Sequence, residues 1–238
     1  MSALLELRQV SKSYGEGRVV VQALDEVQPS VDIGELVAIM GPSGSGKSTL
    51  LTIAGTLEDA TSGDVLIGGT DVSALSRNDQ ARLRRRSIGY VFQSFNLLAG
   101  LSAVENVSLP LELDGTPGGK AAAIARATLH ELGLGERADH YPDELSGGEC
   151  QRVAIARAVV GDRRLLLADE PTGALDSVHG EAVMRLMRSA CKRGVAGVMV
   201  THDAQLASWA DRGLRAGRAR RRPDRLCTAS QRAARARR

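Results

Sequence analysis

The chain has 238 residues, of which 43% are hydrophobic and 25% charged, proportions typical of a globular protein with a buried core. No apolar run approaches the roughly 20 residues that cross a bilayer, and the N-terminus lacks the long apolar stretch of a secretory signal, so we expect neither feature. The three cysteines, Cys150, Cys191 and Cys227, are too far apart to predict a disulfide framework or a metal site, and they fit a reducing compartment.

The net charge of +3 is unevenly distributed along the chain. Residues 212–238 contain eleven arginines against one acid, Asp224, and therefore carry +10. Because the total is only +3, residues 1–211 carry −7. The basic character belongs to the C-terminal part, and nothing in the charge predicts a nucleic-acid-binding surface on the rest.

Two strands are predicted at the start of the chain. Residues 4–10 alternate between apolar and polar side chains, as in a half-buried strand, and residues 19–24 offer a second strand. Tyr14 lies in the turn between them. An exposed aromatic ring at a strand end can stack on a purine base, but such a tyrosine more often serves packing, so Tyr14 alone leaves both roles open.

The most informative motif follows the apolar segment 36–40. Residues 41–48 fit the pattern G-x-x-x-x-G-K-[ST], and residues 48–55 are typical of the first turns of a helix. A strand, a glycine loop and a helix N-terminus form a cradle for phosphate, because glycines let successive N–H groups point at one anion. We expect Lys47 to place its ammonium on the β- and γ-phosphates and Ser48 its hydroxyl on Mg2+. A chance glycine loop before a helix is the less favoured alternative.

The middle of the chain predicts a strand and then an inserted subdomain. Residues 65–71 indicate a small hairpin element, and residues 88–92 a buried strand that ends at Gln93. A glutamine at such a strand end can ligate Mg2+ or hold an attacking water, although Gln93 is weak evidence alone. Residues 95–145 change to short helical patterns broken by glycine and proline, which predicts an insertion.

The inserted segment ends in Leu145-Ser-Gly-Gly-Glu149, immediately before another helical pattern. Ser146 can cap that helix, and Gly147 and Gly148 allow the backbone to approach an anion closely. The same residues would also suit a simple capped loop.

A continuous apolar segment, residues 165–170, ends in two carboxylates. Asp169 is placed to hold Mg2+ through water, and Glu170 to polarise a nucleophilic water. The two need different roles, because adjacent side chains on a strand point in opposite directions unless the strand ends between them. A further buried strand, residues 195–200, leads to His202, at the edge where ligands bind in open α/β sheets. A structural role is the alternative for this histidine.

Taken in order, these motifs resemble the nucleotide-binding subunit of ABC transporters over residues 4–211. The Leu-Ser-Gly-Gly-Glu stretch is the most discriminating element, because GTPases, kinases and helicases share the phosphate loop. The resemblance implies an α/β fold: a P-loop NTPase core with a mainly parallel sheet, an N-terminal antiparallel β subdomain, and an inserted helical subdomain at about residues 95–150.

The resemblance also implies a role for each matched residue. ATP would be bound by Tyr14, stacked on adenine, and by Gly41, Pro42, Ser43, Gly44, Ser45, Gly46, Lys47, Ser48 and Thr49. The ATP of a second subunit would be contacted by Ser146, Gly147, Gly148 and Asp176. Mg2+ would be held by Ser48, Gln93 and Asp169. The catalytic residues would be Glu170, as the base, and His202, as a switch that bonds the γ-phosphate.

A chain that carries both a phosphate cradle and a glycine cap implies that two chains sandwich two ATP molecules, with the γ-phosphate joining them. Residues 91–98 and 101–111 are most similar to the lipoprotein-release, macrolide-export and antimicrobial-peptide-resistance group. That group pairs with permeases of four transmembrane helices and a large extracytoplasmic domain. We therefore expect a homodimer or paired ATPase subunit on the cytoplasmic face of the cell membrane, and no nucleic acid partner. A related clamp for cell-division signalling and a nucleic-acid-handling ATPase are the alternatives.

The resemblance stops at about Arg212. Members of the group continue with an apolar strand, an Asp-Gly turn and a second strand, whereas residues 212–238 are rich in Arg, Ala and Gly. We therefore expect a disordered tail, and with it an exposed sheet edge. Two explanations stay open: a change of reading frame in the gene, and a basic arm that touches anionic lipid or nucleic acid.

Overall fold

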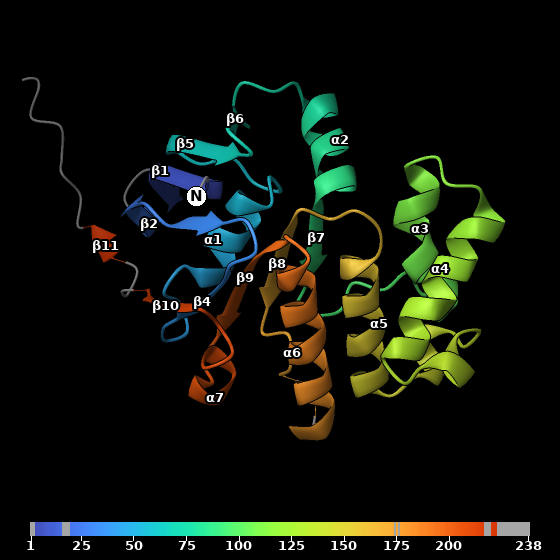
Figure 1. Ribbon diagram of the computed structural model, residues 1–238. Helices are drawn as coiled ribbons and strands as arrows, with labels where there is room; N and C mark the ends of the chain where they lie inside the picture. Colours follow the sequence, from blue (N-terminus) through green and yellow to red (C-terminus); the bar gives the residue numbers. More distant parts are fainter. Residues whose placement is uncertain (1–2, 16–19, 174, 176, 217–219, 223–238) are drawn as a thin grey trace, which may run out of the picture.

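A computed structural model of the chain describes residues 3–15, 20–173, 175, 177–216 and 220–222. In Figure 1 the antiparallel sheet lies at the upper left, the parallel sheet lies beside it, and helices α3 and α4 lie at the right. The antiparallel sheet contains β1 (Ala3–Tyr14), β2 (Val20–Val27), β3 (Ser30–Asp32), β5 (Ser62–Ile67), β6 (Thr70–Asp71) and β11 (Arg220–Arg222). The parallel sheet contains β4 (Leu36–Met40), β7 (Ile88–Val91), β8 (Leu165–Asp169), β9 (Ala196–Thr201) and β10 (Arg212–Arg215).

The parallel sheet has the order β10-β4-β9-β8-β7. Every residue of β8 and of β9 is buried, as the continuous apolar runs of these segments require for strands covered on both faces. The carboxyl ends of β4, β8 and β9 lie at one edge, since these strands pair in parallel register. Residues 41, 169 and 202 follow or end these three strands, so the fold itself gathers them at that edge.

The described part of the chain contains seven helices. They are α1 (Lys47–Ala54), α2 (Arg77–Ser87), α3 (Ala103–Leu113), α4 (Gly118–Glu131), α5 (Gly147–Val159), α6 (Ser177–Lys192) and α7 (Ala204–Ala207), with two short 3-10 turns at Gly135–Arg137 and Pro142–Glu144. The side chains of Leu51 and Ile53 pack between the two sheets, so α1 fills the space that the sheets enclose. Helices α5 and α6 cover the other face of the parallel sheet. No described helix has the length and apolar character needed to traverse a bilayer.

A second core, among α3, α4 and α5, forms the helical region beside the sheets (Figure 1). Its loop 98–102 is organised by Asn106, which is fully buried, accepts from the N–H of Leu98 and donates to the carbonyls of Leu98, Leu101 and Ser102. A capping box between Ser102 and Glu105 begins α3. Helix α5 contributes to this core and to the core against the parallel sheet, and so joins the two regions.

The expected α/β fold, with a parallel core sheet, an antiparallel β subdomain and inserted helices, is confirmed. The expectation of disorder from residue 212 onward is wrong for its first part. Arg212–Arg215 form β10 alongside β4, and Arg220–Arg222 form β11 alongside β2. Main-chain hydrogen bonding needs few apolar side chains, which the composition argument overlooked. Strand β10 also covers the edge of β4 that we expected to be exposed; residues 223–238 lie outside the described part of the chain.

Candidate nucleotide-binding site

The phosphate loop connects β4 to α1. Gly46 adopts φ 83° at the N-cap of α1, and a Cβ atom there would collide with the carbonyl oxygen of Ala23, so only glycine fits. No side chain caps this helix, and its first turn contains no acidic residue. The N–H groups of the first turn are therefore available to an anion, which the helix dipole also favours.

A cavity of about 310 Å³ opens over this loop and is lined by residues 43–49 together with Gln93, Asp169 and Glu170. The ammonium of Lys47 lies across the loop and donates to the carbonyls of Gly41 (2.8 Å) and Pro42 (3.0 Å). The hydroxyl of Ser45 is buried, with the residue 4% exposed, and has no hydrogen-bond partner in the described structure. An orphaned buried hydroxyl and a lysine bonded only to backbone carbonyls both fit a loop whose partner is a phosphate.

Asp169 ends β8 and is only 8% exposed. Burial raises the pKa of its carboxyl, while the hydroxyl of Ser48 and the charge of Lys47 act in the opposite direction. The amide of Gln93 borders the same cavity. A carboxylate, a hydroxyl and an amide oxygen are the hard donors that Mg2+ prefers, and a cation would compensate the buried charge of Asp169, so these residues fit the ion that we expected.

Glu170 follows Asp169 directly but points into the same cavity. Strand β8 ends at Asp169, and Glu170 adopts φ 48°, a left-handed conformation that is rare outside glycine. Its N–H donates to the carbonyl of Val200, which holds the turn. The change of direction between the two residues is what lets neighbouring carboxylates share one site.

The carboxylate of Glu170 is hydrogen-bonded to His202, with 2.8 Å between Oε1 and Nδ1. This bond and the negative charge of Glu170 raise the pKa of the imidazole, whose side chain is 77% exposed. The structure thus brings the two predicted catalytic residues into direct contact. While the contact persists, one oxygen of Glu170 is engaged by the imidazole.

Tyr14 ends β1 and is 39% exposed. Its hydroxyl donates to Glu58 Oε2 at 2.7 Å, and Lys12 Nζ lies 5.2 Å from the ring centroid. Burial, followed by the bond to Glu58, raises the pKa of Tyr14, and a hydrogen bond with Thr49 lowers it. Tyr14 therefore lies beside α1 but does not line the cavity over the phosphate loop, and its stacking on adenine stays a prediction.

The second glycine motif begins α5. Ser146 is the N-cap and accepts from the N–H of Glu149, whose carboxylate accepts from the N–H of Ser146 at 2.8 Å. A Cβ atom on Gly147 would meet no atom within 4 Å. None of Ser146, Gly147 and Gly148 lines the cavity over the phosphate loop. Asp176, the remaining predicted contact to a second subunit, lies outside the described residues.

Sequence reasoning missed Arg157 on α5. Its guanidinium donates to the carbonyls of Asn96 (2.6 Å) and Phe95 (2.8 Å), in the loop that follows Gln93. Both loop residues have positive φ, and burial lowers the pKa of Arg157. Arg157 thus fixes the loop next to the cavity. Its partners are about 60 residues away in the chain, and an arginine among apolar helix residues was the only available signal.

A glycine loop between a parallel strand and a helix, with a buried aspartate ending another strand of the same sheet, defines a P-loop nucleoside triphosphatase. The family described as "ABC transporter" matches residues 24–173. The chain belongs to this family and is one of its ATP-hydrolysing subunits.

Two kinds of curated relative are similar to the chain. The lipoprotein-releasing system ATP-binding protein LolD of Shewanella sp. (strain MR-4) is 50% identical over 212 residues, which are 89% of the chain and 92% of the relative. The macrolide export ATP-binding/permease protein MacB of Marinobacter nauticus is 47% identical over 212 residues, 89% of the chain but only 33% of that relative. The chain therefore spans about a third of the MacB proteins and nearly all of LolD.

Solved structures agree with this result. The dimeric structure of MJ0796, described as a bacterial ABC transporter cassette, has a TM-score of 0.85 and 40% identity, covering 92% of the chain and 98% of the cassette. A second structure of MJ0796, in a post-hydrolysis state bound to ADP and Pi, has the same TM-score and identity over 91% of the chain.

Proposed function

We propose that two copies of the chain close on two ATP molecules and that this closure drives a membrane permease. The observation that carries the proposal is the position of the second glycine motif. Ser146, Gly147 and Gly148 have the character of an anion contact, yet they do not line the cavity over the chain's own phosphate loop. A second copy of the chain is the natural source of the nucleotide that they touch, and the dimer described for MJ0796 supports this arrangement.

The phosphate loop binds the triphosphate within one chain. Lys47 exchanges its two carbonyl acceptors for phosphate oxygens, and the unpaired N–H groups at the start of α1 donate to the same phosphates. Ser48, Gln93 and Asp169 would hold Mg2+, which supplies charge neutralisation on the β- and γ-phosphates when bound. Tyr14, on the neighbouring β1, is the proposed support for the adenine base.

Glu170 acts on the attacking water, and His202 acts on the γ-phosphate. When His202 turns to donate a hydrogen bond to the γ-phosphate, it leaves Oε1 of Glu170 free to accept a proton from the attacking water. The Glu170 side chain is half-buried, 15% exposed, where it lines the cavity beside the phosphate loop. When His202 exchanges its bond to Glu170 for a bond to the γ-phosphate, nucleotide binding is thus coupled to activation of Glu170 as the base.

The permease partner is of the export or extracytoplasmic type, with four transmembrane helices and a large extracytoplasmic domain. Support comes from the names of the relatives, which describe a lipoprotein-releasing system and a macrolide export ATP-binding/permease protein. The additional length of the MacB relatives fits a permease that is fused to the cassette, whereas LolD matches the present chain nearly end to end. The chain itself acts at the inner face of the cell membrane as a peripheral subunit.

Substitution Glu170→Gln tests the shared site. The amide keeps the size of the side chain but cannot accept the proton, so ATP hydrolysis should fall at least about 100-fold while the ATP-bound dimer accumulates. Size-exclusion chromatography with light scattering measures the dimer, and phosphate release measures turnover. Glu181→Gln, which changes an exposed carboxylate on α6, is the matched control and should behave as the unmodified chain. An E170Q chain that stays monomeric with ATP, or that still hydrolyses it, contradicts the proposal.

A further inference from the structure

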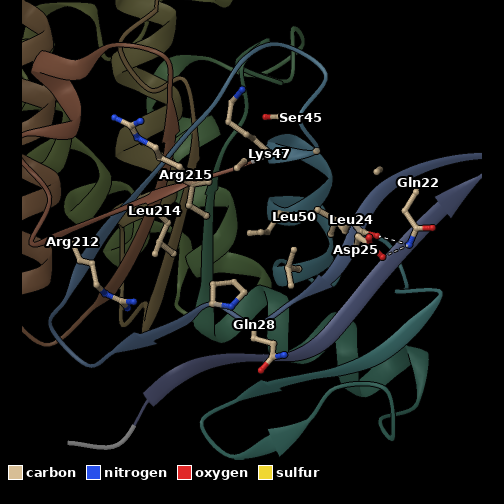
Figure 2. Close-up of a pocket in the computed structure, with 16 residues that line it drawn as sticks. Gln22, Leu24, Asp25, Gln28, Ser45, Lys47, Leu50, Arg212, Leu214 and Arg215 are labelled. Atoms are coloured by element: carbon tan, nitrogen blue, oxygen red, sulfur yellow. Dashed lines mark hydrogen bonds between the residues drawn. The ribbon is translucent and has the colours of Figure 1, made fainter. Parts of the chain in front are cut away.

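A second cavity, of about 540 Å³, is also bordered by the phosphate loop (Figure 2). Ser45 and Lys47 border one end of it, Leu24 of β2 and Leu214 of β10 lie on its flanks, and Leu50 of α1 borders it between them. The loop residues Ser45–Lys47 also line the nucleotide cavity, so the loop separates two open spaces. On the side of the second cavity, the loop is held at Gly46, which lies against the carbonyl of Ala23 in β2.

Another main-chain contact lies at the point where the chain leaves β4. The N–H of Ala216 donates to the carbonyl of Met40 at 2.7 Å, which extends the pairing of β10 with β4 by one bond. A Cβ atom built on Gly41 would lie 2.8 Å from the carbonyl oxygen of Ala216 and 2.8 Å from Ser45 Oγ. Gly41, the first residue of the loop, is therefore enclosed between the end of β10 and the orphaned hydroxyl of Ser45.

We propose that Ala216 is a positioning residue for the phosphate loop: its main chain sets the direction in which the loop leaves β4, and thereby the affinity for the nucleotide triphosphate. The inference rests on the nucleotide site described above and assigns a role to a residue beyond the family motifs. It predicts an effect on ATP binding rather than on the proton transfer at Glu170.

The opposite end of β10 is anchored independently. Asp211 accepts from the N–H of Leu36 at 2.9 Å and from the guanidinium of Arg188 at 2.6 Å. Arg212 pairs with Glu35 at 2.8 Å. These contacts hold the start of β10 against the start of β4, so a change at Ala216 alters the contact with the loop without releasing the strand.

Substitution Ala216→Pro in the full chain tests the role directly, because proline has no N–H to donate to Met40. We expect the Kd for a fluorescent ATP analogue and the KM for ATP to rise about tenfold, with kcat within about twofold of the unmodified chain. Gly213→Ala is the matched control on the same strand, since a Cβ atom there meets nothing within 4 Å. It should change neither value.

Two further variants separate an effect on the position of the phosphate loop from an effect on the stability of the fold. Arg212→Gln removes the ion pair with Glu35 and should lower Tm without changing Kd. Ala216→Gly keeps the N–H but adds backbone freedom, and should raise Kd two- to threefold; it replaces Ala216→Pro if the proline variant does not fold.

Equal Kd values for the Ala216 variants and the unmodified chain overturn the inference and leave the proposed function intact. The same holds if Arg212→Gln raises Kd as much as Ala216→Pro, because the effect would then be one of stability. An unmodified chain that binds no ATP analogue overturns both the inference and the proposed function.

Discussion

The N-termini of α1 and α5 both follow glycine-rich segments, yet they are built differently. Helix α1 begins without a side-chain cap or an acidic residue, and Gly46 in a left-handed conformation leaves the first N–H groups open toward a cavity. Helix α5 begins with a capping box in which Ser146 and Glu149 satisfy each other's main-chain N–H groups. The α1 terminus therefore needs an anion to complete its hydrogen bonds, whereas at the α5 terminus the N–H groups of Ser146 and Glu149 already have partners within the chain.

This difference separates the binding of ATP by one chain from the closure of two chains on the bound ATP. The open terminus of α1, with Lys47 beside it, can bind a triphosphate in a single chain. The carboxylate of Glu149 neutralises part of the positive end of α5, so Ser146 and the glycines attract an anion only weakly on their own. Ser146 and the glycines contact an anion once another subunit presents its bound nucleotide to them. Each of the following predictions tests this difference between the α1 terminus and the α5 terminus.

Substitution Lys47→Ala should have the largest effect, because it removes the ammonium that serves the phosphates at the α1 terminus. We expect the affinity for an ATP analogue to fall at least about 100-fold, with Tm unchanged within a few degrees, since the ammonium bonds only to loop carbonyls. Fluorescence titration measures the affinity, and Lys120→Ala on the exposed surface of α4 is the control. Retention of full affinity would show that the open helix terminus alone binds the nucleotide.

Substitution Gly147→Glu should leave binding intact and prevent closure. The new side chain has free space around it, so the fold tolerates it, but its charge would repel the nucleotide of a second subunit. We expect Kd within about twofold of the unmodified chain and ATP-dependent dimerisation and hydrolysis reduced at least about tenfold.

Gly118→Glu, at the equally open start of α4, is the matched control for this second prediction. It adds the same charge to a helix terminus that has no expected nucleotide contact. A G147E chain that still dimerises with ATP would place the contact elsewhere.

The smallest expected effect is the response of the two sites to pH. The pKa of His202 is raised above its ordinary value of 6.5 by Glu170, so this pair stabilises the fold below pH 6.5 and the stabilisation is lost as pH rises through the raised pKa. The pKa of Glu149 is lowered from 4.5, mainly by the N–H of Ser146, so its contribution is present above pH 4.5 and is lost as pH falls through the lowered pKa.

Thermal melts from pH 3 to 9 of His202→Gln and Glu149→Gln, each against the unmodified chain, measure these two contributions. The Tm difference for His202→Gln should be confined to the acidic side and vanish in base. The difference for Glu149→Gln should persist at neutral and basic pH and fade in acid. Parallel differences at all pH values would mean that neither group acts through its charge.

Local patterns in the sequence predicted most of the fold. Buried strands such as β8 and β9 appear as continuous apolar runs, and the phosphate loop has fixed spacing, because both depend on residues that are neighbours in the chain. The pattern also placed Asp169 and Glu170 at a strand end. It left open how adjacent carboxylates could share a site, which depends on the left-handed conformation of Glu170.

Contacts between distant residues were not predictable in the same way. The bond of His202 to Glu170, the bonds of Arg157 to the loop after Gln93, and the pairing of β10 with β4 each join separate elements. Their formation depends on packing of the whole domain, so no local periodicity signals them. Composition misled us at β10, because an arginine-rich segment can still pair through its main chain.

The place of β10 also matters during synthesis of the chain. Leu36 and its partner Asp211 are 175 residues apart, so the ribosome produces β4 long before the strand that covers its edge. Until then β4 exposes unpaired N–H and C=O groups along an apolar strand, which favours pairing with other nascent chains. Cells that make this protein therefore have reason to shield the nascent chain with a chaperone until translation has passed Arg215.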